Sequence, residues 1–208
     1  GSKSHTVRAL VIATLAEGRS RVLGPLDSAD TRACLGACEA IGAAIEESTD
    51  GESGLNCWTV DGTAGRPQTA EDVIDVRNSG TTLYVLLSTA ALIDGWTVFT
   101  GDAQIRRRSA GPLLEALREL GAEAFSTRPG GCAPLLVRGR LSGGRTRIEC
   151  PTSQYLSSLL INCPMAEGDT TIDVPLLYER PYVEMTCRWL TDRGVRFDAA
   201  EDFSRIQI

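Results

Sequence analysis

Residues 78–121 have the sequence NSGTTLYVLLSTAALIDGWTVFTGDAQIRRRSAGPLLEALRELG, and the same order of features occurs in residues 2–42 and 152–194. Each copy opens with residues suited to a helix N-cap, continues as an apolar helix and reaches an acidic residue followed by glycine, which predicts a turn. A short strand and a second, amphipathic helix follow in every copy. The chain therefore contains three copies of one unit, and this internal repeat determines the fold.

The second helix of each copy ends at a glycine, at Gly42, Gly121 and Gly194. Glycine adopts the left-handed conformation that commonly terminates a helix. Between the copies, alternating apolar and polar residues predict strands at residues 44–48, 55–60, 73–76, 123–126, 135–138 and 145–150.

Each complete unit is therefore strand, helix, strand, helix, strand, strand (βαβαββ), and we expect parallel pairing of strands through the helical crossovers. The first helices of the second and third copies are apolar on nearly every side, which predicts burial inside a ring of sheets. The predicted fold class is α/β, with three pseudo-threefold βαβαββ repeats around buried parallel helices. We expect residues 1–208 to form a single domain, with repeats at approximately 1–65, 66–139 and 140–208.

The second and third copies each follow a strand that leads into their first helix, whereas the first copy begins at Gly1 without one. Residues 203–208, at the other end, are a strand-like run with no following turn. We therefore expect one domain of a longer protein, lacking its leading strand. A naturally short protein is the alternative.

Charge and cysteine content limit the classes of function. A net charge of −6 leaves no overall basic field, which disfavours a nucleic acid partner. No apolar run reaches the roughly 20 residues that span a bilayer, and the first residues resemble neither a signal peptide nor a transit segment. Seven cysteines, an odd number, indicate reduced thiols. We expect a cytoplasmic protein that binds no nucleic acid and no membrane.

A metal site is not predicted. Cys34 and Cys38 have the i,i+4 spacing of two ligands on one helix face, but no second Cys/His pair accompanies them, and His5 is the only histidine. No cofactor is expected.

The N-termini of the three buried helices point to one end of the domain, where free N–H groups and positive helix dipoles converge. Lys3, the only lysine, lies at one of these ends, where it can contact a phosphate or move a proton. Ordinary capping explains any single end, but three ends built alike favour an anion site. The other residues at these ends are Ser2, Ser4, Asn78, Ser79, Gly80, Thr81, Thr152, Ser153 and Gln154.

Arginines add to this predicted site, because the guanidinium fork matches carboxylate and phosphate oxygens. Arg8 lies just over one turn along the first helix, and residues 106–108 form an Arg-Arg-Arg cluster. We expect one arginine of the cluster to point at ligand and the others at water. Arg180 and Tyr182, which open the second helix of the third copy, can reach the same end, although Arg180 can equally just precede Pro181 at the first helical position.

Several motifs resemble those of the 5-enolpyruvylshikimate-3-phosphate synthases, in the family's order and over essentially the whole chain. They are GSKSHTVRAL at 1–10, NSGTT at 78–82, TGDAQIRRR at 100–108, TSQYLSSLL at 152–160 and ERPYVEMT at 179–186. The resemblance implies the amino-terminal one of two enolpyruvyl transferase domains, each similar to an inverse α/β barrel. In the family a double crossover joins the two domains, and the N-terminal strand belongs to the other one.

The family, also called 3-phosphoshikimate 1-carboxyvinyltransferase, transfers the enolpyruvyl group of phosphoenolpyruvate to the 5-hydroxyl of shikimate 3-phosphate. This step belongs to the shikimate pathway, which leads to chorismate and the aromatic amino acids. The resemblance implies that Lys3 is catalytic, in proton transfer. The family's Asp and Glu acid–base pair lies in the C-terminal domain, the implied partner, so this chain alone is expected to be inactive.

The resemblance also assigns ligand contacts. Tyr84 departs from the family pattern, because many members have a phosphoenolpyruvate-binding arginine there. Glu179 stands where many have a serine that contacts the shikimate phosphate; a carboxylate would repel it, so either the contact is lost or Glu179 points away. The implied contacts are Lys3, Ser4, Arg8, Thr152, Ser153, Gln154 and Tyr182 for shikimate 3-phosphate, and Lys3, Asn78, Gly80, Arg108 and Gln154 for phosphoenolpyruvate.

Two alternatives remain. The enolpyruvyl transferases of cell-wall synthesis, which use a UDP-sugar, share the repeat architecture, but their second motif and catalytic cysteine loop are not matched. Cys132, within PGGCAPL, lies in a predicted turn without a basic neighbour, so we interpret it as structural. The other alternative is a non-catalytic module for anion binding or assembly.

Overall fold

The computed structural model describes residues 1–208 and contains six α-helices and eleven strands, with short 3-10 turns at Ile105–Arg107, Pro129–Gly131 and Cys163–Met165. The helices are α1 Lys3–Leu15, α2 Ala29–Ala40, α3 Gly80–Ala90, α4 Gly111–Glu119, α5 Ser153–Asn162 and α6 Arg180–Asp192. The strands are β1 Arg19–Leu23, β2 Ala44–Thr49, β3 Asn56–Asp61, β4 Ile74–Asp75, β5 Thr97–Thr100, β6 Glu123–Ser126, β7 Leu135–Arg138, β8 Gly144–Cys150, β9 Thr170–Leu177, β10 Asp198–Ala199 and β11 Arg205–Gln207.

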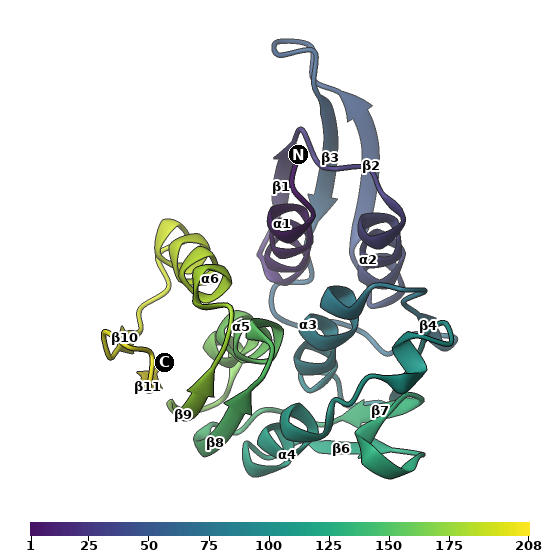
Figure 1. The fold of residues 1–208 in the computed structure, drawn as a ribbon. Coiled ribbons are helices and arrows are strands. Elements are labelled where there is room, and N and C mark those ends of the chain that lie inside the picture. The colour runs from purple at the N-terminus through teal and green to yellow at the C-terminus, as the bar shows by residue number, and fades with distance from the viewer.

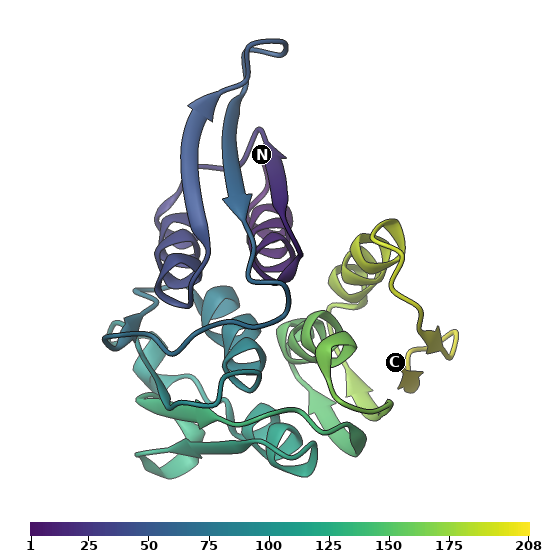
Figure 2. The same ribbon diagram turned by 180° about the vertical axis from the view of Figure 1, so that it is seen from behind.

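The three repeats form three sheets on the outside of the molecule, with α1, α3 and α5 between them (Figure 1). Seen from behind, the hairpin of β2 and β3 projects beyond the helices (Figure 2). The predicted α/β fold class, with buried helices inside sheets, is therefore confirmed.

The helix boundaries agree with the repeat. The first helix of each copy starts directly after Ser2, Ser79 or Thr152, and the hydroxyls of the latter two accept hydrogen bonds from helix N–H groups. The second helices are followed by glycines in the left-handed region, with φ of 106° at Gly42, 98° at Gly121 and 75° at Gly194. A residue with a Cβ would be strained there, which is why each copy stops its helix with glycine.

The sheets share one strand order. The second sheet is β4-β5-β7-β6 and the third, written in the same sense, is β8-β9-β11-β10, while the first is β1-β3-β2. In the second and third sheets the strands flanking the first helix pair in parallel, β4 with β5 and β8 with β9. In the first sheet β1 has β3 as its one partner, so its other edge is unpaired.

The expected parallel pairing is wrong for the second helix of each copy. The strands flanking α2, α4 and α6 are separated by the last strand of the repeat, which runs antiparallel to both. The last strand returns by a hairpin and inserts between the two, so the crossover ends one position farther along the sheet. Antiparallel pairing of a hairpin needs only a short connection, which favours this insertion.

The core is organised around the first helices. Every residue of α3 except Thr81 is buried, and so is every residue of α5 except Gln154. Polar groups on these helices satisfy one another inside the core: Ser88 Oγ lies 2.5 Å from Ser158 Oγ, and Thr89 Oγ1 donates to Asn162 Oδ1 at 2.9 Å. Such pairs fix the register between the helices, and each group in them has a hydrogen-bond partner. None of the helices has the length and apolar character needed to cross a membrane.

Candidate functional site

A small hollow lies where the N-termini of α1, α3, α5 and α6 meet. Its volume is about 150 Å³, and Thr81 and Gln154, the non-buried residues of the two core helices, both contribute to its wall. All of the residues predicted to contact shikimate 3-phosphate line it except Thr152. The lining residues are Lys3, Ser4, Arg8, Thr81, Ser153, Gln154, Glu179 and Tyr182.

Arg8 forms the floor of the hollow and is only 1% exposed. Its Nε donates to Thr186 Oγ1 at 2.7 Å, and its Nη2 donates to Ser157 Oγ at 2.9 Å and to the carbonyl of Tyr182 at 3.2 Å. Nη1 donates to the carbonyl of Ser4 at 3.0 Å, which leaves one of its two N–H groups for a ligand.

No carboxylate neutralises Arg8. Burial lowers the pKa of Arg8 from 12.5 to about 10, and the nearby Tyr182 opposes that shift, so the guanidinium is still charged at neutral pH. A buried positive charge held only by neutral acceptors is costly unless an anion compensates it. The floor of the hollow is therefore prepared for a negatively charged group.

Lys3 lies at the rim, with its side chain 47% exposed. Its Nζ is 3.7 Å from Asp30 Oδ2, a long contact between partly exposed groups. Pairs of this kind contribute little to stability, so the ammonium can leave Asp30 for a ligand at small cost.

The N-terminus of α5 supplies hydrogen-bond donors, but an internal carboxylate already holds them. Glu179 Oε2 accepts from the Ser153 N–H and Ser153 Oγ, both at 3.1 Å, and from Thr152 Oγ1 at 3.3 Å. Of the two outcomes expected for Glu179, pointing away is therefore wrong: the carboxylate points at the donors. Gln154 Oε1 beside them is buried and has no hydrogen-bond partner.

The residues predicted for phosphoenolpyruvate lie on the α3 side. A Cβ placed on Gly80 would lie 2.7 Å from Arg108 Nη1 and 3.7 Å from Gln154 Oε1, so these three residues are close neighbours. Arg108 is exposed and makes no side-chain hydrogen bond or ion pair. Asn78 is also exposed and does not line the hollow.

The other two arginines of the cluster do not line the hollow, and Arg106 does not point at water as expected. Arg106 donates to the carbonyl of Gly101, and Arg107 is exposed without a side-chain partner. Of the two alternatives for Arg180, the one that places it at the site is wrong. Its Nε donates to Glu184 at 3.0 Å and its Nη2 to the carbonyl of Glu201 at 2.6 Å, which fixes the start of α6 to the loop before β11.

Tyr84 is a packing residue. It is 4% exposed, meets Tyr155 edge-on with the ring centroids 5.0 Å apart, and donates to the carbonyl of Ser109 at 3.1 Å. Tyr155 donates to the same carbonyl at 2.6 Å. Burial raises the pKa of Tyr84, so the hydroxyl stays neutral. Since Ser109 follows Arg108, the two tyrosines hold the backbone next to that arginine.

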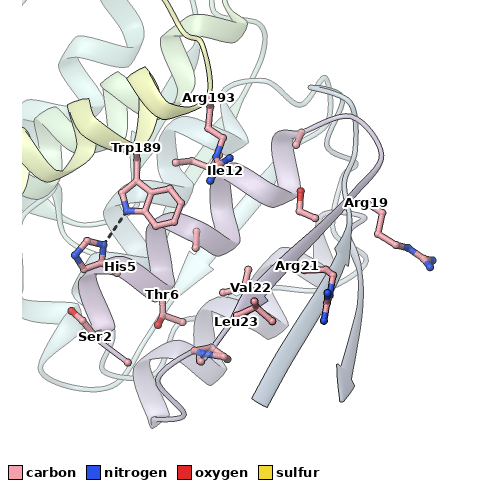
Figure 3. Close-up of a pocket in the computed structure, with 16 residues that line it drawn as sticks. Ser2, His5, Thr6, Ile12, Arg19, Arg21, Val22, Leu23, Trp189 and Arg193 are labelled. Atoms are coloured by element: carbon pink, nitrogen blue, oxygen red, sulfur yellow. Dashed lines mark hydrogen bonds between the residues drawn. The ribbon is translucent and has the colours of Figure 1, made fainter. Parts of the chain in front are cut away.

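A larger cavity lies on another face of α1 (Figure 3). Its volume is about 550 Å³, and its walls are α1, the whole of β1 and the end of α6, where Trp189 Nε1 donates to His5 Nδ1 at 3.1 Å. It follows the unpaired edge of β1, where the other two sheets have a fourth strand. Of the residues at the predicted helix ends it includes only Ser2, so the smaller hollow is the candidate site.

Ser157 and Thr186, which hold Arg8 in place, are not among the residues predicted from the sequence. Each lies four residues after a predicted contact, Ser157 after Ser153 and Thr186 after Tyr182, and therefore on the same helix face. That spacing is a signal that could have identified both. Cys132 lies after the 3-10 turn between β6 and β7, away from the hollow, consistent with a structural role.

Comparison with known proteins gives one consistent match. The model of the EPSP synthase (3-phosphoshikimate 1-carboxyvinyltransferase) family matches residues 1–208. The chain is 53% identical over 198 residues to the 3-phosphoshikimate 1-carboxyvinyltransferase of Acetivibrio thermocellus, covering 95% of this chain and 45% of the relative. It is 48% identical over 208 residues to that of Methanothrix thermoacetophila, covering 99% and 48%.

Solved structures agree. An EPSP synthase from Acinetobacter baumannii has a TM-score of 0.84 and 26% sequence identity, covering 100% of this chain and 45% of the other. The chain thus spans about half the length of the curated relatives it matches, between 43% and 48% of each.

Proposed function

The chain belongs to the EPSP synthase family, and on that basis we propose that it is the shikimate 3-phosphate-binding half of an enolpyruvyl transferase. The full enzyme would move the enolpyruvyl group of phosphoenolpyruvate to the 5-hydroxyl of shikimate 3-phosphate. The observation that carries the proposal is the buried, carboxylate-free Arg8 beneath a hollow at four helix N-termini. Helix N-termini bind phosphates through free N–H groups and the helix dipole.

The proposed contacts to shikimate 3-phosphate divide by chemistry. The phosphate suits the N-terminus of α5, where Thr152 and Ser153 offer two hydroxyls and a backbone N–H within reach of one oxygen atom. The remaining N–H of Arg8, with Ser4, Gln154 and Tyr182, would bind the carboxylate and hydroxyls of the ring.

Phosphoenolpyruvate is proposed to bind on the α3 side, between Lys3, Gly80, Arg108 and Gln154, with Asn78 before the helix. Arg108 supports this assignment because its guanidinium is exposed, unpaired and in contact with Gly80. The ammonium of Lys3 lies between the two proposed ligand positions. From there Lys3 can transfer a proton as the new bond forms.

The chain is proposed to act with the C-terminal domain of the same synthase, since it covers less than half of the relatives' length. The base and acid implied for that domain would complete the reaction, so the isolated chain is expected to bind but not to turn over. The domain limits and the cytoplasmic location stay predictions.

The test is a titration of the isolated chain with shikimate 3-phosphate, with and without phosphoenolpyruvate, followed by amide NMR. Saturable shifts at Ser4, Arg8, Ser153 and Gln154 support the proposal, and a UDP-sugar acceptor should leave these amides unmoved. A folded spectrum without shifts would mean that the isolated half has no formed pocket for this ligand.

A further inference from the structure

Glu179 occupies the place where an anionic ligand would bind. One oxygen, Oε2, accepts all three hydrogen bonds, from the N–H and hydroxyl of Ser153 and the hydroxyl of Thr152, over 3.1 to 3.3 Å. A phosphate oxygen at a helix N-terminus is held by donors of the same kind. The carboxylate and a ligand phosphate therefore compete for one set of donors.

The backbone directs this side chain inward. Glu179 is the N-cap of α6 and has the left-handed values φ 58° and ψ 38°, which are uncommon for residues other than glycine, Asn and Asp. Pro181 follows two residues later at the start of α6, so the backbone before the helix is restricted. The backbone of Glu179 is therefore fixed by α6, and its side-chain carboxylate extends across to the N-terminus of α5.

No cation pairs with Glu179. Arg180 beside it bonds to Glu184, and Lys3 across the hollow is next to Asp30. The negative charge is instead stabilised by neutral donors and the positive end of the α5 dipole. Because residue 179 is exposed, the side chain can rotate out to water without disturbing the core.

We infer that Glu179 is a specificity-determining residue, an internal anion that a phosphorylated ligand must displace from the N-terminus of α5. It lowers the affinity of the site for a phosphate and leaves the affinity for an uncharged hydroxyl at the same position largely unchanged. This inference rests on the proposed function for the identity of the ligand, but the occupation of the donors by Glu179 does not depend on it.

Two variants test this inference. Glu179→Ser removes the carboxylate that accepts from Thr152 and Ser153, and Glu179→Gln keeps a neutral acceptor at the same place. Glu179→Ser should tighten binding of shikimate 3-phosphate by at least about tenfold, because a like charge is removed from the phosphate position. Glu179→Gln should fall between Glu179→Ser and the parent chain. Binding of unphosphorylated shikimate should change by less than about twofold, since it places a neutral hydroxyl at the phosphate position and its carboxylate is assigned to the Arg8 side of the hollow.

Glu149→Gln is the matched control, because Glu149 is exposed, makes no side-chain hydrogen bond or ion pair, and its loss changes the net charge equally. It should alter neither affinity. If Glu179→Ser leaves the ratio of the two affinities unchanged, or weakens binding of the phosphorylated ligand, Glu179 is not a competitor.

Inorganic phosphate gives a readout independent of shikimate. Followed at the amide of Ser153, phosphate should bind more tightly to Glu179→Ser than to the parent chain. Equal binding overturns the inference. Tighter phosphate binding without any response to shikimate 3-phosphate supports the role of Glu179 and rejects the proposed ligand. Far-ultraviolet circular dichroism on each variant verifies that α6 is retained.

Discussion

The Nε atom of Arg8 donates a 2.7 Å hydrogen bond to the hydroxyl of Thr186, which lies 178 positions later in the chain. Ser157 joins the pair, since its hydroxyl accepts from Arg8 Nη2 and lies 2.9 Å from Thr186 Oγ1. One buried cluster therefore fixes α1, α5 and α6 together at the hollow. The geometry of the candidate site therefore depends on the packing of the first repeat against the third.

Arg8→Ala should abolish saturable binding of shikimate 3-phosphate and lower the free energy of unfolding by about 2 kcal/mol. Binding is lost because the variant lacks the buried positive charge of the Arg8 guanidinium, which attracts the anionic ligand. Stability falls because the carbonyls of Ser4 and Tyr182 lose donors, although Ser157 and Thr186 still bond to each other. Urea unfolding and an NMR titration measure the two effects.

Arg107→Ala is the control, because Arg107 is exposed and has no side-chain partner. It should leave both quantities unchanged. Unaltered affinity in Arg8→Ala would remove Arg8 from the proposed site, and an equal loss in both variants would indicate a general effect of net charge.

Gly80→Ala should weaken phosphoenolpyruvate binding several-fold while sparing shikimate 3-phosphate. The new methyl would lie 2.7 Å from Arg108 Nη1, so the guanidinium has to move. The fold should tolerate the change, because the nearest atoms belong to flexible side chains and Gly80 does not have a positive φ. Calorimetric titration of phosphoenolpyruvate into chain saturated with shikimate 3-phosphate measures the effect.

Gly36→Ala is a matched control within α2, where an added Cβ meets nothing within 4 Å. It should raise the free energy of unfolding by about 0.5–1 kcal/mol, as alanine favours a helix interior, and leave both affinities as they were. If Gly80→Ala binds phosphoenolpyruvate with unchanged affinity, the position of Arg108 next to Gly80 is not needed to bind that ligand.

Most helix and strand boundaries could be predicted because the repeat presents each signal three times. Glycines at 42, 121 and 194 mark equivalent helix ends, and all three have the expected positive φ. The order of strands could not be predicted in the same way. Which strand lies next to which depends on long-range hydrogen bonds, and the alternation of apolar residues is the same for β6 beside β5 as for β6 beside β7.

The candidate site, like the fold, could be predicted from the sequence only in part. Lys3, Ser153 and Gln154 could be placed at one end of the domain because helix N-termini define it. The direction of Glu179 could not, because it depends on a left-handed backbone that the residue type does not favour. Arg8 was predicted as a ligand contact, but its main partners are Thr186 and Ser157, which only the packing of distant helices brings near.

Tyr84→Phe should reduce the free energy of unfolding by about 1 kcal/mol or less and change the affinity for either ligand by less than about twofold. The lost hydroxyl donates to the carbonyl of Ser109, which keeps its 2.6 Å hydrogen bond from Tyr155. Thermal unfolding and the same titrations measure both. A large loss of affinity would place Tyr84 in contact with ligand, contrary to its burial in the core.

Asp173 joins two strands of the third sheet, and its effect on stability should depend on pH. It accepts hydrogen bonds from Arg145 on β8 at 2.6 Å and from Arg205 on β11 at 2.8 Å. These two hydrogen bonds lower the pKa of Asp173 below its ordinary 3.8. A carboxyl with a depressed pKa in the folded state stabilises the fold above its unfolded pKa, and this contribution is lost as the pH falls through the folded value.

Asp173→Asn should therefore be less stable than the parent chain at pH 7, and the difference should shrink as the pH falls below about 3.8. Urea unfolding over a pH series, with the two chains side by side, measures that difference. Asp192→Asn, which changes an exposed carboxylate without a partner, should show no such trend. A difference that stays constant from pH 7 to pH 2 would mean that Asp173 acts through shape or hydrogen-bond geometry, since protonation would then leave its contribution intact.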